Sequence, residues 1–152
     1  MSVHAEITRE VDQSPAGPKV GAFFDLDGTL VAGYSALEFV RDGVLSGRMG
    51  AADFGEALLT AARFQMGQVS FSAFVTGTAG SLRGRSEQEF REVGERIFRT
   101  RLAATIYPES RALVDAHRHR GHTVCMVSAA TPYQIEPLAR DMGIEHILCT
   151  RL

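Results

Sequence analysis

Several features that mark particular classes of protein are scarce or missing in this sequence. The 152 residues include no tryptophan, two cysteines and a single lysine, Lys19, beside fifteen arginines. No apolar run reaches the roughly 18 residues that span a bilayer, so we expect no membrane-spanning segment. The formal net charge of −2 gives no electrostatic attraction to nucleic acid or to an anionic membrane, so neither is an expected partner.

The composition that remains is that of an ordinary globular domain. Hydrophobic residues make up 45% and charged residues 22% of the chain, whose length suits one domain. Cys125 and Cys149 lie in apolar stretches, which predicts buried free thiols and a cytoplasmic location. Residues 1–19 are polar, lack the apolar core of a secretion signal and end in a Pro/Gly-rich stretch, so we expect a disordered leader.

Three short apolar runs predict the strands of a parallel sheet. They cover residues 20–24, 122–127 and 144–150, and such runs are typical of strands buried on both faces. The first run ends at Asp25 and the second at Ser128. Ligands of parallel sheets bind beyond the carboxyl ends of the strands, so this placement predicts that Asp25 and Ser128 share a site.

Helical patterns fill most of the remaining chain. Ser35 with Glu38, and Ser86 with Glu89, have the spacing of capping boxes, with Ser35 and Ser86 as the predicted N-caps. Further helices are expected over residues 51–66, 71–75, 109–120 and 132–142. The order of elements predicts an α/β fold with a parallel sheet and an inserted helical cap. We expect the core over residues 20–32 and 105–152, and the cap over residues 33–104.

Asp25 and Asp27 are the residues most suggestive of chemistry. An ionised carboxylate at the end of a buried strand is costly unless something compensates its charge, and a divalent cation such as Mg²⁺ would do so. A carboxylate can also attack phosphorus, while a second one protonates the leaving oxygen. Asp27-Gly28 taken alone, however, is more typical of an ordinary turn than of a catalytic site.

The longer string from Phe24 to Leu30, FDLDGTL, resembles the first signature of the haloacid dehalogenase superfamily. The apolar run that ends at Ser128 resembles its second signature. The resemblance covers the chain from Val20 onward and implies a Rossmann-like parallel sheet with a helical cap of the C1 type. The position of the insert resembles subfamily IB, which contains phosphoserine phosphatase, and also the phosphatase-like domain fused to some bacterial lysophospholipid acyltransferases.

This resemblance implies a role for each matching residue. Asp25 would be the nucleophile and a Mg²⁺ ligand, and Asp27 the general acid and base with its backbone carbonyl on the metal. The phosphoryl oxygens would be bound by two hydroxyls and three backbone amides, those of Thr29 and Ser128 and those of Leu26, Gly28 and Ala129. Such an inventory suits phosphoryl transfer, which depends on positioning and charge neutralisation.

The sequence departs from the superfamily pattern in two respects. The pattern also needs a lysine and a later acidic pair, and after Ser128 the acids are Glu136, Asp141 and Glu145, none of which follows a later strand. We therefore expect a C-terminally truncated chain. In phosphoserine phosphatases a cap glutamate grips the substrate amine, and Tyr34 occupies that position here, so phosphoserine is not the expected substrate.

The function expected from these residues is Mg²⁺-dependent hydrolysis of a small organic phosphate monoester through an aspartyl-phosphate. The alternative is a catalytically incomplete phosphate-binding or regulatory domain, such as part of a phosphatase–acyltransferase fusion. A phosphotransferase or mutase would need a second phosphate site. Two other clusters receive non-catalytic interpretations: the residues 83–85 are expected in a solvated loop, and His117, His119 and His122 at a solvated helix end.

Overall fold

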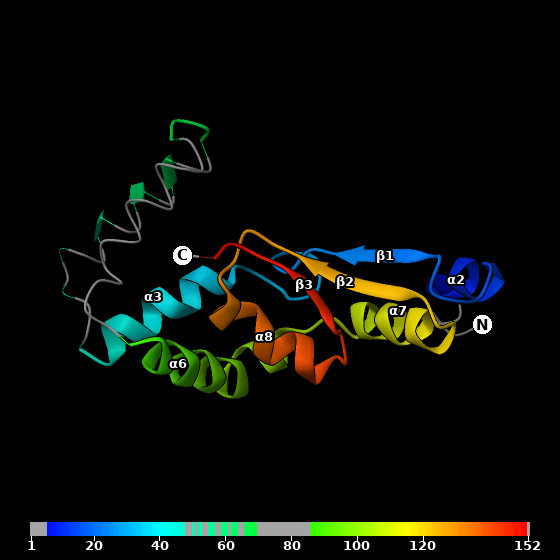
Figure 1. Ribbon diagram of the computed structural model, residues 1–152. Helices are drawn as coiled ribbons and strands as arrows, with labels where there is room; N and C mark the ends of the chain where they lie inside the picture. Colours follow the sequence, from blue (N-terminus) through cyan, green and yellow to red (C-terminus); the bar gives the residue numbers. More distant parts are fainter. Residues whose placement is uncertain are drawn as a thin grey trace.

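The chain folds around a short parallel sheet with helices on one side (Figure 1). The structure, a computed structural model, describes residues 6–47, 50, 52, 55–56, 59–60, 62–63, 66–69 and 86–151. In chain order its elements are α2 (Arg9–Gln13), β1 (Gly21–Phe24), α3 (Ser35–Leu45), α6 (Glu87–Thr100), the 3₁₀ helix η2 (Leu102–Thr105), α7 (Pro108–His119), β2 (Thr123–Val127), α8 (Pro132–Asp141) and β3 (His146–Leu148).

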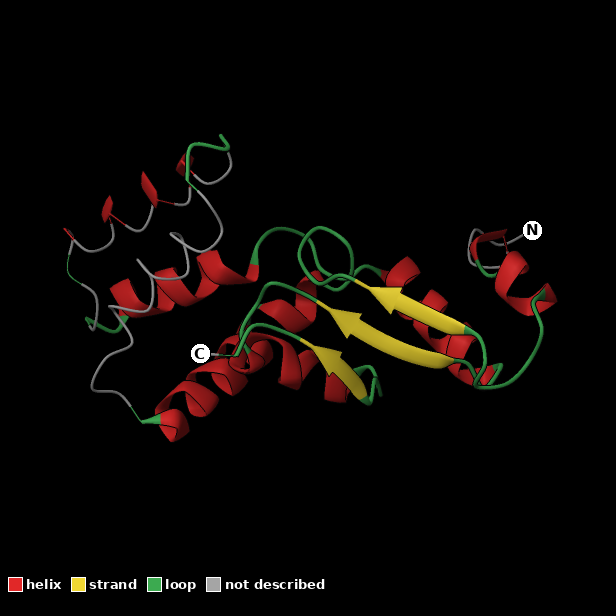
Figure 2. Ribbon diagram, turned by 45° about the horizontal axis from the view of Figure 1, so that its top comes forward, coloured by secondary structure: helices red, strands yellow, loops and turns green. Residues whose placement is uncertain are grey.

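The sheet confirms the α/β fold that the apolar runs predict. Its strands are parallel in the order β1-β2-β3, with Phe24 opposite Met126 and Met126 opposite Ile147. Figure 2 shows helices behind the three strands, and the core lies between them and the sheet. Inward-facing residues such as Ala22 and Val124 are buried there.

The opposite face of the sheet differs from the expectation of strands buried on both sides. Phe23 on β1 is 70% exposed, and Val127 and Leu148 on the neighbouring strands are exposed as well. Among the described residues, no helix or strand covers this face. The apolar runs therefore identified the strands correctly, while only one face of the sheet is packed within the part of the chain that the structure describes.

Local sequence signals explain where the later helices begin and end. At Ser86 the predicted capping box is confirmed, because its hydroxyl accepts from the Glu89 backbone N–H while Glu89 accepts from the Ser86 N–H. Helix α7 ends before Gly121, whose φ of +72° is the left-handed conformation that closes helices. The turn at Gly121 then leads into β2.

The leader does not match the expected disorder. Residues 9–13 form helix α2, whose Val11 is buried and which packs beside α7. The following turn is held from the core, since the Arg120 guanidinium donates to the Ser14 carbonyl and the His122 ring lies 2.9 Å from the Pro15 carbonyl oxygen. These contacts are tertiary, which is why a polar local sequence gave no sign of them.

The histidines near the end of α7 also differ from the expected solvated end. His122 is buried, and its Nδ1 lies 2.8 Å from the Nδ1 of His117. The His117 ring also meets the edge of Phe24, with ring centroids 5.9 Å apart. His119 is exposed, as predicted. Both cysteines are free, as predicted. Cys125 is buried as expected, whereas Cys149 is only half-buried.

Much of the insert falls outside the description. The helix expected over residues 51–66 is described only at scattered positions, and both the helix around residues 71–75 and the loop at residues 83–85 lie outside the described residues. None of the described helices is long and apolar enough to cross a membrane. Helices α3 and α6, near the two ends of the insert, lie side by side beyond the carboxyl ends of the strands (Figure 1).

Candidate active site

The carboxyl ends of β1 and β2 carry the predicted site residues. Because Phe24 pairs with Met126, Asp25 and Ser128 leave the sheet at the same edge. Asp25 is exposed and Ser128 half-buried. The Ser128 amide donates to the Leu148 carbonyl over 3.0 Å, and its hydroxyl oxygen accepts from the Ala130 amide. The turn after β2 is thereby fixed, and the Ser128 hydroxyl keeps its proton to donate.

The loop after Asp25 is held rigidly by burial of its apolar residues. Leu26, Leu30 and Val31 are fully buried, and each such side chain stabilises the fold by about 1.5–3 kcal/mol. Within the loop, the amides of Leu30 and Val31 both donate to the Leu26 carbonyl. The alternation of apolar and polar residues in the signature therefore buries one set of side chains and leaves Asp25 and Thr29 exposed.

Gly28 has a structural role in this loop that differs from the one expected of its amide. Its φ is +74°, where residues with a side chain are strained. Its N–H donates to the Val31 carbonyl over 2.9 Å, so this donor is already used within the loop. This N–H therefore has a partner within the tight turn, and its expected contribution to an anion cradle stays a prediction.

Hydrogen bonds from the start of helix α7 hold the same loop. The buried hydroxyl of Ser110 donates to the Thr29 carbonyl over 2.8 Å. The Tyr107 amide, just before the helix, donates to the Leu30 carbonyl over 3.0 Å. These bonds satisfy backbone groups that would otherwise be costly to bury, and they place the Thr29 side chain at the exposed edge.

Asp27 is held by the first residue of α3. Its Oδ1 accepts from the Ser35 backbone N–H over 2.6 Å, and its Oδ2 accepts from the Ser35 hydroxyl over 3.1 Å. Burial raises the pKa of the Asp27 carboxyl and the nearby Asp25 charge adds to this, while the two Ser35 bonds oppose it. The net direction is upward, which favours the protonated form that a general acid needs.

This contact overturns the predicted capping box at Ser35. Tyr34 is the N-cap of α3, and Ser35 is the first helical residue. Glu38 instead forms an ion pair with Arg101, in which the Arg101 Nη1 lies 3.3 Å from the Glu38 Oε2. The spacing of Ser35 and Glu38 is that of a capping box, but the first N–H group of α3 donates to the Asp27 carboxylate instead. The spacing of Ser35 and Glu38 cannot reveal this contact, because Asp27 lies eight residues before Ser35.

Gln134 also belongs to the surroundings of Asp27, and it was not among the predicted site residues. It lies on α8, is 9% exposed, and its Nε2 donates to the Ser35 hydroxyl oxygen over 3.1 Å. Its Oε1 accepts from both the backbone N–H and the hydroxyl of Thr131, each over 2.8 Å. Thr131 and Gln134 have the spacing of a capping box, and this spacing could have predicted that Gln134 bonds to Thr131.

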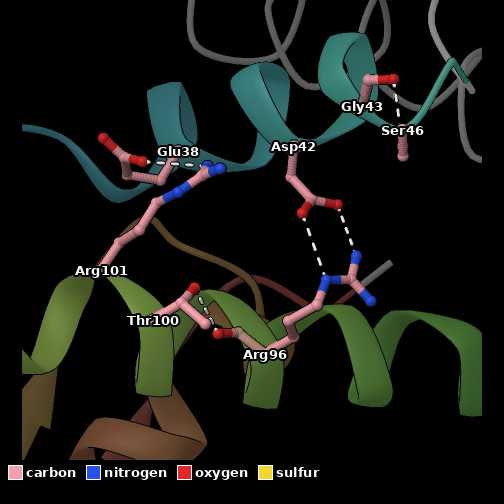
Figure 3. Close-up of polar contacts among 7 residues, drawn as sticks. All are labelled: Glu38, Asp42, Gly43, Ser46, Arg96, Thr100 and Arg101. Atoms are coloured by element: carbon pink, nitrogen blue, oxygen red, sulfur yellow. Dashed lines mark hydrogen bonds and ion pairs between the residues drawn. The ribbon is translucent and has the colours of Figure 1, made fainter.

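Two ion pairs hold α3 against α6, as Figure 3 shows. The Arg96 guanidinium binds both carboxylate oxygens of Asp42, at 2.6 and 3.3 Å. Arg101 binds Glu38 one turn closer to the site. Since α6 packs on α8, these pairs connect the helix that bears Ser35 to the helix that bears Gln134.

The donor set at the strand ends suits a hard cation. Mg²⁺ prefers oxygen ligands, usually one or two carboxylates, and keeps several waters. Asp25 offers an exposed carboxylate, whereas both side-chain oxygens of Asp27 already accept from Ser35. Within the described part of the chain, no group of three or more His, Cys, Asp or Glu side chains could hold a metal alone.

A hollow of about 570 Å³ lies elsewhere, between α6, α8 and β3. Most of its charged lining is already paired, because Arg91 binds Glu87 and Glu136, and Arg140 binds Glu95. The hollow does not include Asp25, Asp27 or Ser128. We therefore assign no site to it.

Comparison with known proteins shows the family. The family model described as haloacid dehalogenase-like hydrolase matches residues 22–152. The chain belongs to this family. The match begins within β1 and includes both the Asp25–Asp27 loop and the turn after β2.

Individual relatives agree with this assignment. The chain is 32% identical over 143 residues to phosphoserine phosphatase SerB1 of Mycobacterium tuberculosis, covering 91% of this chain and 46% of that protein. Thus it spans about half the length of the curated relative it matches. A Bordetella pertussis protein of unknown function superposes with a TM-score of 0.76 at 22% identity, covering 86% of this chain and 59% of that one. A phosphoserine phosphohydrolase-like protein of Francisella tularensis gives 0.63 at 19%, covering 86% and 57%.

Proposed function

We propose that this domain hydrolyses phosphate monoesters of small organic molecules through an aspartyl-phosphate on Asp25. The observation that carries the proposal is the pairing of two carboxyls with different environments at one strand end. Asp25 is exposed, as a nucleophile needs to be, while the pKa of Asp27 is raised mainly by burial. An exposed carboxylate suits a nucleophile, and surroundings that favour the protonated form suit a general acid.

In the first half-reaction a carboxylate oxygen of Asp25 attacks phosphorus. The bond from phosphorus to the ester oxygen breaks, and Asp27 gives its proton to that oxygen, which leaves as an alcohol. In the second half-reaction the Asp27 carboxylate takes a proton from water, whose oxygen attacks phosphorus. Inorganic phosphate leaves, Asp25 is regenerated as a carboxylate, and Asp27 is again protonated.

The phosphoryl oxygens are proposed to meet the hydroxyls of Thr29 and Ser128 and the amides of Leu26 and Ala129. Thr29 is exposed at the loop and Ser128 retains a proton to donate. Mg²⁺ is the proposed cofactor, held by the Asp25 carboxylate and the Asp27 backbone carbonyl. When bound, it would neutralise negative charge on the phosphoryl group and the two carboxyls.

Tyr34 is proposed to shape the substrate preference. It directly precedes Ser35, and its side chain is 53% exposed at the start of α3. A tyrosine here offers an aromatic face and a hydroxyl but no charge for a substrate amine. The phosphoserine in the name of the Mycobacterium tuberculosis relative is therefore not carried over to this chain. We further propose that residues 33–104 form a cap over a core of residues 20–32 and 105–152, and that the protein is cytoplasmic.

Phosphate release from p-nitrophenyl phosphate tests the proposal. The assay compares Mg²⁺ with EDTA, and the parent chain with Asp25→Asn, which keeps the size of the side chain but removes the nucleophile. We expect Mg²⁺-dependent release that Asp25→Asn abolishes. Phosphate binding without release would favour the non-catalytic alternative, and release that survives Asp25→Asn would contradict the proposed nucleophile.

A further inference from the structure

The hydrogen bonds between α8, α3 and the loop after β1 form a chain with one possible direction. The Thr131 backbone N–H can only donate, so the atom of Gln134 that faces it is the amide oxygen. The Gln134 nitrogen must then be the atom that faces Ser35, and it can only donate. The Ser35 hydroxyl oxygen accepts that bond, which leaves its single proton for Asp27.

The chain is buried along most of its length. Ser35 is 0% and Gln134 9% exposed. In such surroundings a hydrogen bond is strong, and a polar atom left without a partner is costly, so each link fixes the next one. The bond from the Ser35 backbone N–H adds a second constraint on Asp27, on its other oxygen.

We infer that Ser35 and Gln134 are positioning residues, which orient the Asp27 carboxyl toward the leaving-group oxygen by a directed chain of hydrogen bonds from Thr131. The inference rests on the proposed phosphatase function. Both carboxyl oxygens of Asp27 accept one bond from Ser35, and each keeps a lone pair, so the group is oriented without losing its capacity to carry a proton.

The chain also ties the acid to the cap. Ser35 is the first residue of α3, and α3 is held to α6 by Arg96–Asp42 and Arg101–Glu38. A displacement of α3 from the core would break the Ser35 bonds to both Asp27 and Gln134 together. Asp27 is therefore held in its position only while α3 is docked.

A comparison of two substrates distinguishes positioning from general stability. p-Nitrophenolate leaves readily without a proton, whereas the alkoxide of an alkyl phosphate such as glycerol phosphate needs one from the general acid. For Ser35→Ala and Gln134→Glu we expect first-turnover release of the alcohol from the alkyl phosphate to slow about tenfold or more, and first-turnover release of p-nitrophenolate less than about threefold. The first turnover is compared because hydrolysis of the aspartyl-phosphate needs Asp27 with both substrates. Equal losses on both substrates, or none, would overturn the inference.

Gln134→Glu is the sharper variant, because a glutamate still accepts from Thr131 and so keeps the helix cap, but it cannot donate to Ser35. Ser86→Ala is the matched control, since it removes a capping hydroxyl from α6 without touching Asp27. It should leave the ratio of the two substrates unchanged. Circular dichroism checks that each variant is folded.

Amide hydrogen exchange separates failure of the inference from failure of the proposed function. If the parent chain hydrolyses neither substrate, the phosphatase proposal fails for this chain, and the exchange rate of the Ser35 amide decides the inference alone. That amide is bound to Asp27 over 2.6 Å. We expect the Ser35 amide to exchange about tenfold faster in Gln134→Glu than in Ser86→Ala, because Gln134 no longer orders the Ser35 hydroxyl. Unchanged exchange would overturn the inference.

Discussion

At the scale of single residues, the two aspartates of the signature loop differ in their surroundings, and their proposed roles follow from that difference. Asp25 lies exposed beyond β1, while Asp27 turns back toward the start of α3 and accepts two bonds from Ser35. The same residue type can thus serve as nucleophile and as acid. One residue of separation in the sequence is enough, because Ser35 binds the carboxyl of Asp27 while Asp25 stays exposed.

Asp27→Asn is predicted to abolish the acid without unfolding the loop. An asparagine can still accept from Ser35 through its amide oxygen, but it carries no transferable proton. Hydrolysis of an alkyl phosphate should fall about 10²–10⁴-fold, the usual contribution of general acid–base catalysis. Steady-state kinetics beside a thermal unfolding curve check this. A variant that retains alkyl phosphatase activity would exclude Asp27 as the acid.

His117 is predicted to make the fold less stable at acidic pH. Burial, reinforced by His122, lowers the pKa of His117. In the unfolded chain the imidazole has its ordinary pKa, so between the folded and the ordinary value the unfolded state binds more protons. Stability is therefore full above the ordinary pKa and falls as the pH drops through it toward the folded value.

The measurement is urea denaturation of the parent, His117→Gln and the exposed-site control His119→Gln, between about pH 8 and about pH 5. The loss of stability on acidification should be smaller in His117→Gln than in the parent, and unchanged in His119→Gln. Equal losses in all three proteins would show that His117 does not contribute.

At the scale of elements, the helices α6 and α8 meet more closely than side chains normally allow. The glycine at position 94 permits this, since a Cβ there would lie 2.0 Å from the Tyr133 carbonyl oxygen. The carbonyl belongs to the backbone at the start of α8 and cannot swing away. Close packing of the two helices keeps the N-terminal end of α8, with Thr131 and Gln134, next to α3.

Gly94→Ala should therefore destabilise the protein by about 1–3 kcal/mol, as overpacking of a core does. Gly55→Ala is the matched control, because it is also a helical glycine but its added Cβ would meet no described residue within 4 Å. That change should be neutral or stabilising by up to about 1 kcal/mol. Urea denaturation measures both, and an equally tolerated Gly94→Ala would contradict the close approach.

The ion pair between Arg96 and Asp42 should contribute more than an ordinary surface pair. It is bidentate, and the Asp42 side chain is 13% exposed. A double-mutant cycle to alanine should give a coupling of about 1 kcal/mol, larger than the coupling of the exposed pair Arg91–Glu87 on one helix. Unfolding free energies in low salt provide the measurement. Equal coupling energies would mean that the Arg96–Asp42 pair stabilises the protein no more than an exposed surface pair does.

At the scale of the whole molecule, the sequence predicted the features that depend on local pattern. Apolar runs located the strands, and their ends placed Asp25 and Ser128 at one edge. Contacts between distant segments were not predictable in the same way. The helix in the leader depends on Arg120 and His122, and the Ser35–Asp27 bond depends on how α3 leaves the loop, so each was missed for lack of a local signal.

The account of the whole domain depends on Asp25 as the nucleophile, and trapping the covalent intermediate tests this most directly. The chain is incubated with Mg²⁺ and p-nitrophenyl phosphate and quenched in acid, and its peptides are analysed by mass spectrometry. Asp27→Asn serves as a second background, where loss of the general base should let the intermediate accumulate. We predict a phosphate adduct on Asp25 in both proteins, with a larger share in Asp27→Asn. A phosphate adduct on Ser128, or phosphate release with Asp25 unmodified in both proteins, would contradict the account.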